Sequence, residues 1–148
     1  MTAEELGRAI FEGRGTQALP AYLAAGGSVD AVDPNSRMPM LHLACEHQDL
    51  EMIRALVEAG ADLNLRDAFG HTPLHIAVDN DTDAVAQAGG DAEDIRYETT
   101  ILLLQLGADR DIRDNAGRTP RDLAALAGRV PLERFDRLTS SISGPPPG

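Results

Sequence analysis

Two histidines and an aspartate near the middle of the chain have a spacing that could hold a metal ion. His71 and His75 are four residues apart, so on a helix they share one face, and Asp79 follows one turn later. The run Asp79-Asn80-Asp81-Thr82-Asp83 also imitates the start of a calcium loop. Such a loop needs glycine at its sixth position and glutamate at its twelfth, and this chain has alanine and glycine there. Calcium binding is therefore not expected.

Nucleophilic catalysis finds no support in the sequence. Cys45 is the single cysteine, which excludes an internal disulfide, and its apolar neighbours predict a buried small side chain. No serine or cysteine stands in a recognisable nucleophile context with a histidine, and no glycine-rich phosphate loop occurs. We therefore predict no enzyme, no catalytic residue and no cofactor.

The surroundings of His75 repeat along the chain. The segment 60–75 is matched by 107–122, with shared Gly-Ala-Asp, Arg-Asp and Thr-Pro groups, and 26–33 resembles the same turn. His42 lies 33 positions before His75, in a matching Leu-His-X-Ala context. A period of this length suits two antiparallel helices and a turn, a unit that buries its apolar face only by stacking on its neighbours.

The period and the motif Thr72-Pro73-Leu74-His75 resemble the ankyrin-repeat family over about residues 4–138. The resemblance implies an all-α solenoid of about four helix-turn-helix units with β-turn tips. It also implies that His75 hydrogen-bonds the threonine hydroxyl and the neighbouring loop, so no metal site is expected at this histidine pair. The predicted units cover 2–38, 39–71, 72–118 and 119–138, together forming a domain over 1–138, with a flexible Pro/Gly/Ser tail over 139–148.

The third unit is longer than the others. Thr72 and Thr119 are 47 positions apart, where the repeat requires 33. The extra residues fall within about 79–94, a stretch rich in aspartate that has no basic residue. We expect an elongated helical hairpin that projects as an acidic prong, with Val85 and Ala88 near Ala92 and Ile95. The alternative is a disordered acidic loop, because like charges at this density favour solvation.

The outer units depart from the repeat pattern. The first tip, 34–38, is one residue longer than the next, which predicts a distorted turn. Pro20 is expected to open the first outer helix, and an amphipathic helix after Pro131 is expected to close the domain. In the last unit Arg121 and Asp122 replace Leu-His, as expected where no further unit covers them.

Composition limits the partners. The chain has 148 residues, a formal net charge of −11 and thirteen basic residues that are all arginine. This charge opposes nucleic-acid binding and favours a protein with a basic surface. No stretch reaches the roughly 18 apolar residues of a membrane span, and the acidic first residues do not resemble a signal peptide. We expect a cytoplasmic monomer, and the lysine-free, alanine-rich composition predicts a bacterial source.

The resemblance places partner binding on the concave face, which is lined by the tips and the exposed side of the inner helices. Phe69 is the expected anchor, because an exposed aromatic on a turn is typical of interfaces, although it could instead fold onto the neighbouring tip. The candidate residues are Asn35, Arg37, Met38, Glu46, His47, Ala68, Phe69, His71, Asp79, Asn80, Asp81, Asp83, Asn115 and Arg118.

Two functions remain open at this stage. The first is a non-catalytic protein-protein interaction module that binds through its concave face and acidic insertion. The second is an immunity protein or antitoxin-like inhibitor, whose acidic surface would cover the cleft of a basic enzyme such as a nuclease toxin.

Overall fold

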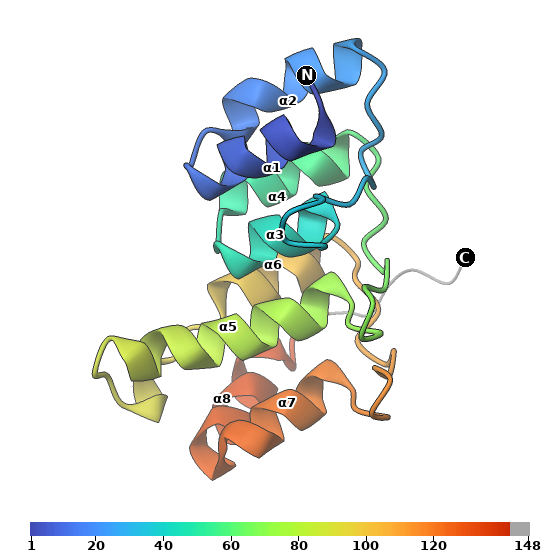
Figure 1. The fold of residues 1–148 in the computed structure, drawn as a ribbon. Helices are drawn as coiled ribbons and strands as arrows, with labels where there is room; N and C mark the ends of the chain where they lie inside the picture. Colours follow the sequence, from blue (N-terminus) through green and yellow to red (C-terminus); the bar gives the residue numbers. More distant parts are fainter. Residues whose placement is uncertain (143–148) are drawn as a thin grey trace. The chain divides into compact units, whose positions relative to one another are not determined.

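A computed structural model describes residues 1–142, and over this range it contains α-helices, one 3₁₀ turn and an isolated bridge between Val32 and Pro39 (Figure 1). This agrees with the predicted all-α class. The chain divides into two compact parts, unit 1 (Met1–Asp62) and unit 2 (from Leu63 onward). No helix within the described range is long and apolar enough to cross a membrane.

Unit 1 consists of two helical hairpins. Its helices are α1 (Ala3–Phe11), α2 (Gly15–Ala24), α3 (Met40–Glu46) and α4 (Leu50–Glu58). The inner helices α1 and α3 pack on each other, and each packs on its own outer helix, α2 or α4. Apolar side chains at helical spacing fill the space between them: Leu6, Ile10, Met40, Leu41, Cys45, Met52, Ile53 and Leu56 are all at most 2% exposed.

Two local predictions for unit 1 have different outcomes. Pro20 does not open α2 but lies inside it, because the tight turn after α1 already starts α2 at Gly15. The first tip is distorted as predicted: the backbone N–H of Asp33 donates to Met38 O, and Arg37 has a φ of 61°. The extra residue therefore places arginine in the left-handed region, where the other tips have glycine.

Unit 2 also consists of two hairpins. Its elements are α5 (Pro73–Gln87), the 3₁₀ turn η1 (Ala92–Asp94), α6 (Glu98–Gln105), α7 (Pro120–Ala127) and α8 (Arg129–Thr139). The inner helices α5 and α7 pack together, with α6 behind α5 and α8 behind α7 (Figure 1). The buried centre is formed by Leu74, Ala77, Val78, Ile95, Tyr97, Leu103, Leu104, Ala124 and Phe135.

The insertion lengthens only one helix, which corrects the expectation of an elongated hairpin. α5 has 15 residues, whereas α7 has 8, and the return segment contains only the short turn η1. Ile95 and Tyr97 are buried against α8, where Tyr97 Oη donates to Pro131 O at 2.8 Å and Arg134 Nε donates to Ile95 O at 2.7 Å. These contacts with α8 hold the return segment extended in place of a second long helix.

Two details of the C-terminal half also differ from the expectation. α8 begins at Arg129, before Pro131, and it continues to Thr139. Of the predicted flexible tail, residues 143–148 lie outside the described residues.

Candidate functional site

Each of the two tips of unit 2 is built around one aspartate. Asp67 Oδ1 accepts hydrogen bonds from the backbone N–H groups of Phe69 and His71, both at 2.9 Å. Asp114 Oδ1 accepts from Ala116 and Arg118 in the same way, also at 2.9 Å. In each tip the aspartate carboxylate accepts from backbone N–H groups that would otherwise lack a partner, and this constrains the backbone of the turn. The side chains of the turn are therefore free to point outward.

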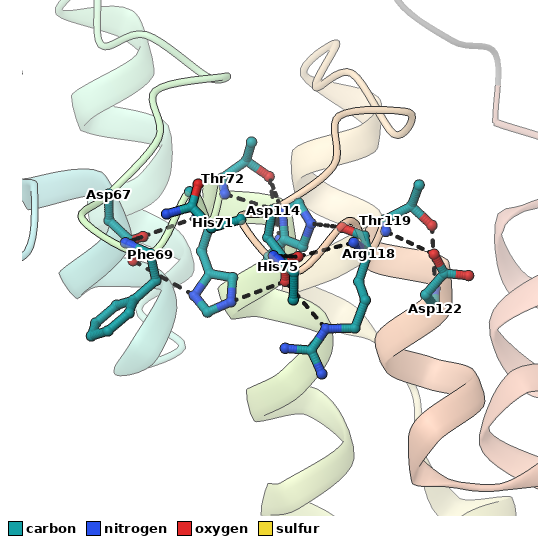
Figure 2. A network of polar contacts seen from close by, with 12 residues as sticks. Asp67, Phe69, His71, Thr72, His75, Asp114, Arg118, Thr119 and Asp122 are labelled. Carbon is teal, nitrogen blue, oxygen red and sulfur yellow. Dashed lines mark hydrogen bonds and ion pairs between the residues drawn. The ribbon is translucent and has the colours of Figure 1, made fainter.

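His75 joins the start of α5 to the next tip (Figure 2). Its Nδ1 accepts from the backbone N–H of Thr72 at 3.1 Å and lies 2.8 Å from Thr72 Oγ1. Because Nδ1 accepts, the ring proton is on Nε2, which donates to Arg118 O at 2.8 Å. Thr119 and Asp122 form the corresponding capping box at the start of α7. The hydrogen bonds expected for His75 are therefore confirmed.

Burial and the neighbouring His71 lower the pKa of His75, although the bond to Arg118 O partly opposes this. A histidine whose folded pKa is below its unfolded value of 6.5 contributes full stability above that pH and loses it as the pH falls. The free energy of unfolding should therefore fall between pH 7.5 and 5.5, and His75 can account for at most about 1.4 kcal/mol of this loss, because pH 5.5 is one unit below the unfolded pKa. Urea unfolding of the wild type and His75→Gln at both pH values measures this effect. An equal loss in both proteins would contradict the assignment.

His71 lies between the two tip aspartates. Its Nδ1 is 3.8 Å from Asp67 Oδ2 and its Nε2 is 3.3 Å from Asp114 Oδ2, and Arg118 Nε lies 3.5 Å from the same Asp114 oxygen (Figure 2). Burial opposes ionisation of Asp114, but the N–H groups of Arg118 and Ala116 and the Arg118 guanidinium keep the pKa of its carboxyl below the usual range. Asp114 is therefore charged at neutral pH, and it helps to hold the two tips together.

Asn115 adds direct bonds between the tips. Its backbone N–H donates to Phe69 O at 3.1 Å, its Nδ2 donates to Ala68 O at 3.3 Å, and its Oδ1 accepts from Arg66 Nη2 at 3.2 Å. Asn115 was predicted to bind a partner, and although it is exposed, it has a structural role in joining the two tips.

Phe69 does not fold onto the neighbouring tip. Its side chain is 70% exposed and points away from the polar network in Figure 2, with the His71 ring 6.1 Å from it, centroid to centroid. The backbone of this turn is already held by hydrogen bonds to Asp67 and Asn115. Another molecule could therefore bind the Phe69 ring with little loss of backbone entropy.

Asp81 must be removed from the predicted binding residues because it is only 7% exposed. Its Oδ2 accepts from the backbone N–H of Thr100 at 3.0 Å and from Thr100 Oγ1 at 2.8 Å, so it caps the start of α6 from the neighbouring helix α5. The sequence carries a weak signal of this role, since Tyr97, the N-cap residue of α6, is not one of the short polar residues that usually cap a helix start.

Three of the other predicted residues of unit 2, Asp79, Asp83 and Arg118, line a hollow between α5 and α7, whereas Ala68 and Asn80 do not. Ala68 lies on the tip and Asn80 Nδ2 donates to Ile76 O at 3.0 Å. Asp79 and Asp83 are exposed on α5, and Arg118 lies at the tip end. The hollow has a volume of about 310 Å³, and its remaining lining is His71, His75, Ile76, Thr82, Leu123, Leu126 and Ala127. The contribution of α7 to this hollow was not predicted. The signal for it was Leu126, an apolar residue that lies off the buried face of α7 and is 66% exposed.

In unit 1 the predicted residues lie around the first tip and the end of α3. Asn35, Arg37, Glu46 and His47 are exposed, and Met38 is half-buried. The exposed Phe11 ring on α1 meets the His47 ring edge-on at a centroid distance of 5.1 Å.

Within residues 1–142, no group of three or more His, Cys, Asp or Glu side chains could hold a metal ion. The His71 and His75 rings instead contact groups of unit 2: His75 is hydrogen-bonded to Thr72 and Arg118, and His71 lies against the carboxylates of Asp67 and Asp114.

Comparison with known proteins gives one consistent result. The family model for ankyrin repeats in many copies matches residues 22–77, and the model for a single ankyrin repeat matches 69–115. The chain is 37% identical over 71 residues to the Neurogenic locus Notch protein of Drosophila melanogaster, covering 48% of this chain and 3% of that protein. It is 36% identical over 61 residues to an ankyrin repeat-containing protein of Schizosaccharomyces pombe, covering 41% and 29%. The chain thus spans less than a third of these relatives.

Among solved structures, the Legionella effector AnkH is similar, with a TM-score of 0.70 and 24% sequence identity. The match covers 94% of this chain and 26% of that chain, and it is a likeness of fold.

Proposed function

The chain belongs to the ankyrin-repeat family, whose repeats generally serve protein-protein interaction, and we propose from this that it is a non-catalytic module that binds a protein partner. The binding surface in this proposal comprises the tips, the exposed sides of the inner helices and the acidic insertion. In this family that surface is the concave face.

Phe69 is the observation that carries the proposal. The Phe69 side chain is 70% exposed. It lies on a tip whose backbone is held by two hydrogen bonds, one from the Phe69 N–H to Asp67 Oδ1 and one from the Asn115 N–H to Phe69 O. Aromatic side chains on rigid supports are enriched among residues that dominate binding energy. Since the ring contributes little to the core, its exposure is better explained by binding than by folding.

Charge supports a basic partner. Asp79, Asp83, Asp91 and Glu93 are exposed, and none forms an ion pair within the described part of the chain. With a net charge of −11, the protein would attract a positively charged partner and accelerate the encounter.

The same exposed carboxylates favour a second candidate, an immunity protein or antitoxin that inhibits a basic enzyme such as a nuclease. In either case we propose a monomer that acts in the cytoplasm of a bacterium. An inhibitor would abolish the activity of the captured enzyme at one-to-one stoichiometry, whereas an adaptor would leave it unchanged.

Affinity capture from host lysate at low and moderate salt tests the proposal. Phe69→Ala is expected to weaken binding of the recovered partner by roughly tenfold or more. Val32→Ala, which shortens another exposed apolar side chain, is the control. Equal retention of the partner by both variants would reject the proposed surface.

The contribution of charge is tested by neutralising the insertion and not by deleting it, because deletion would remove the buried Asp81 and Thr82. The variant Asp91→Asn/Glu93→Gln is compared with Glu51→Gln/Glu58→Gln, which removes the same charge from exposed positions on α4. A greater loss of affinity and of salt dependence in the insertion variant is expected. An acidic partner whose binding does not depend on the salt concentration would contradict a contribution from charge.

A further inference from the structure

The lengthened α5 adds a second hollow to the one between α5 and α7. This second hollow has a volume of about 230 Å³ and lies where the end of α5 meets η1 and the junction of α7 and α8. The two hollows share Thr82, Asp83 and Ala127 in their linings, so they meet at that point. We call the combined surface the α5 trough.

We propose that the α5 trough binds an amphipathic segment of a basic partner protein, with an arginine or lysine at Asp83 and an apolar side chain on either side of it. This inference rests on the proposed function, because it assigns the partner's chemistry to one part of the binding surface. The insertion is what gives the trough its second half.

The two halves offer apolar walls. In the first, Ile76 on α5 faces Leu123 and Leu126 on α7. In the second, Val85 and Ala86 face Ala92, Ile95 and Pro131. Because α5 extends past the end of α7 in Figure 1, its last turns carry this second wall beyond the region that an α7-length helix would cover. Each hollow is large enough for one aliphatic side chain, which gains free energy by leaving water.

The junction of the two halves is negatively charged. Asp83 is exposed and lies one turn after Asp79, and no arginine pairs with either carboxylate within residues 1–142. Partial burial and the charge of Asp83 raise the pKa of Asp79, and His71 and Arg118 in the same lining oppose this only in part, so a further cation would be favourable here.

Selection of a phage-displayed library of random 16-residue peptides on the full chain tests this assignment. We expect the enriched peptides to share an arginine or lysine flanked by apolar residues. For a synthetic copy of an enriched peptide, fluorescence anisotropy should show roughly tenfold weaker binding to Asp83→Asn and to Leu126→Asn. Glu58→Gln removes the same charge from an exposed position on α4, outside both hollows, and should change the affinity less than about twofold.

A double-mutant cycle makes the pairing specific. Once the peptide's basic residue is replaced by glutamine, Asp83→Asn should have almost no further effect. Equal losses in Asp83→Asn and Glu58→Gln would overturn the inference in favour of diffuse attraction. Enriched peptides that lack a basic residue, or whose binding is insensitive to Leu126→Asn, would also overturn the inference. So would self-association of the chain in sedimentation experiments that Leu126→Asn abolishes, because the trough would then bind a second copy.

The outcomes for the trough and for the module are separable. If no library peptide binds the trough while lysate capture still depends on Phe69, the trough is rejected and the proposed module stands. If trough peptides bind as described but Phe69→Ala has no effect on capture, the tip surface is rejected.

Discussion

Replacement of Asp81 with alanine is expected to lower the free energy of unfolding by about 3 kcal/mol. The substitution removes the carboxylate that accepts both the backbone N–H and the hydroxyl of Thr100, a residue with no exposed surface. Each of these bonds involves a charged acceptor, and their loss leaves a buried amide and a buried hydroxyl without that partner. Urea unfolding followed by circular dichroism measures the loss, and amide exchange at Thr100 localises it to the start of α6.

Two further variants separate this explanation from a general effect of charge. Asp81→Asn retains a side-chain oxygen that can accept from Thr100, so we expect a loss of about 1 kcal/mol. Asp83→Ala removes the same charge two residues later, at an exposed position, and should change stability by less than about 0.5 kcal/mol. If Asp81→Ala and Asp83→Ala were equally mild, Asp81 would not be a structural cap.

Asp81 and Asp83 show why neighbouring acids in one helix can differ so much in role. Residues two apart on an α-helix point to opposite sides, so Asp81 faces α6 while Asp83 faces the trough. Both were predicted to bind a partner, because the sequence alone does not reveal which side of α5 another helix covers. That information depends on how the insertion returns.

The parts of unit 2 that could be predicted are those fixed by contacts close in sequence. Thr72 and Thr119 cap α5 and α7 as their Thr-Pro motifs predict, because a capping box needs only residues three apart. His75 could be assigned through the family resemblance. The asymmetric insertion could not be predicted, because Tyr97 and Ile95 are held by α8, which is more than thirty residues further along the chain.

The hydrogen bonds between the tips could not be predicted from the sequence either. Asn115 looked like a free residue on an exposed turn, and its contacts with Phe69 and Arg66 connect residues 46 and 49 positions apart. The glycines at the two tips of unit 2 provide a measure of this contact, since Gly70 and Gly117 occupy the same place in the repeat.

Gly70→Ala is expected to destabilise the protein by about 3 kcal/mol, and Gly117→Ala by only about 1 kcal/mol. Both glycines have positive φ, 77° and 79°, so a side chain meets the same backbone strain in each. A Cβ at Gly70 would lie 2.4 Å from Asn115 Oδ1 and 2.8 Å from the Asn115 backbone nitrogen, whereas a Cβ at Gly117 meets nothing within 4 Å.

The backbone term cancels in the difference between the two variants, which leaves the packing around a Cβ at Gly70. Besides Asn115 of the next tip, this Cβ would meet Arg66 Nη2 of its own tip at 2.6 Å, but that atom is the end of a flexible side chain and can move away. Urea unfolding of both proteins measures it, and Asn115→Ala in each background tests the cause. The truncation removes the Oδ1 clash but not the backbone contact, so Gly70→Ala should recover only part of its loss when Asn115 is shortened. Equal losses in Gly70→Ala and Gly117→Ala would show that the tips are independent, and the support proposed for Phe69 would then reduce to the turn around Asp67 alone.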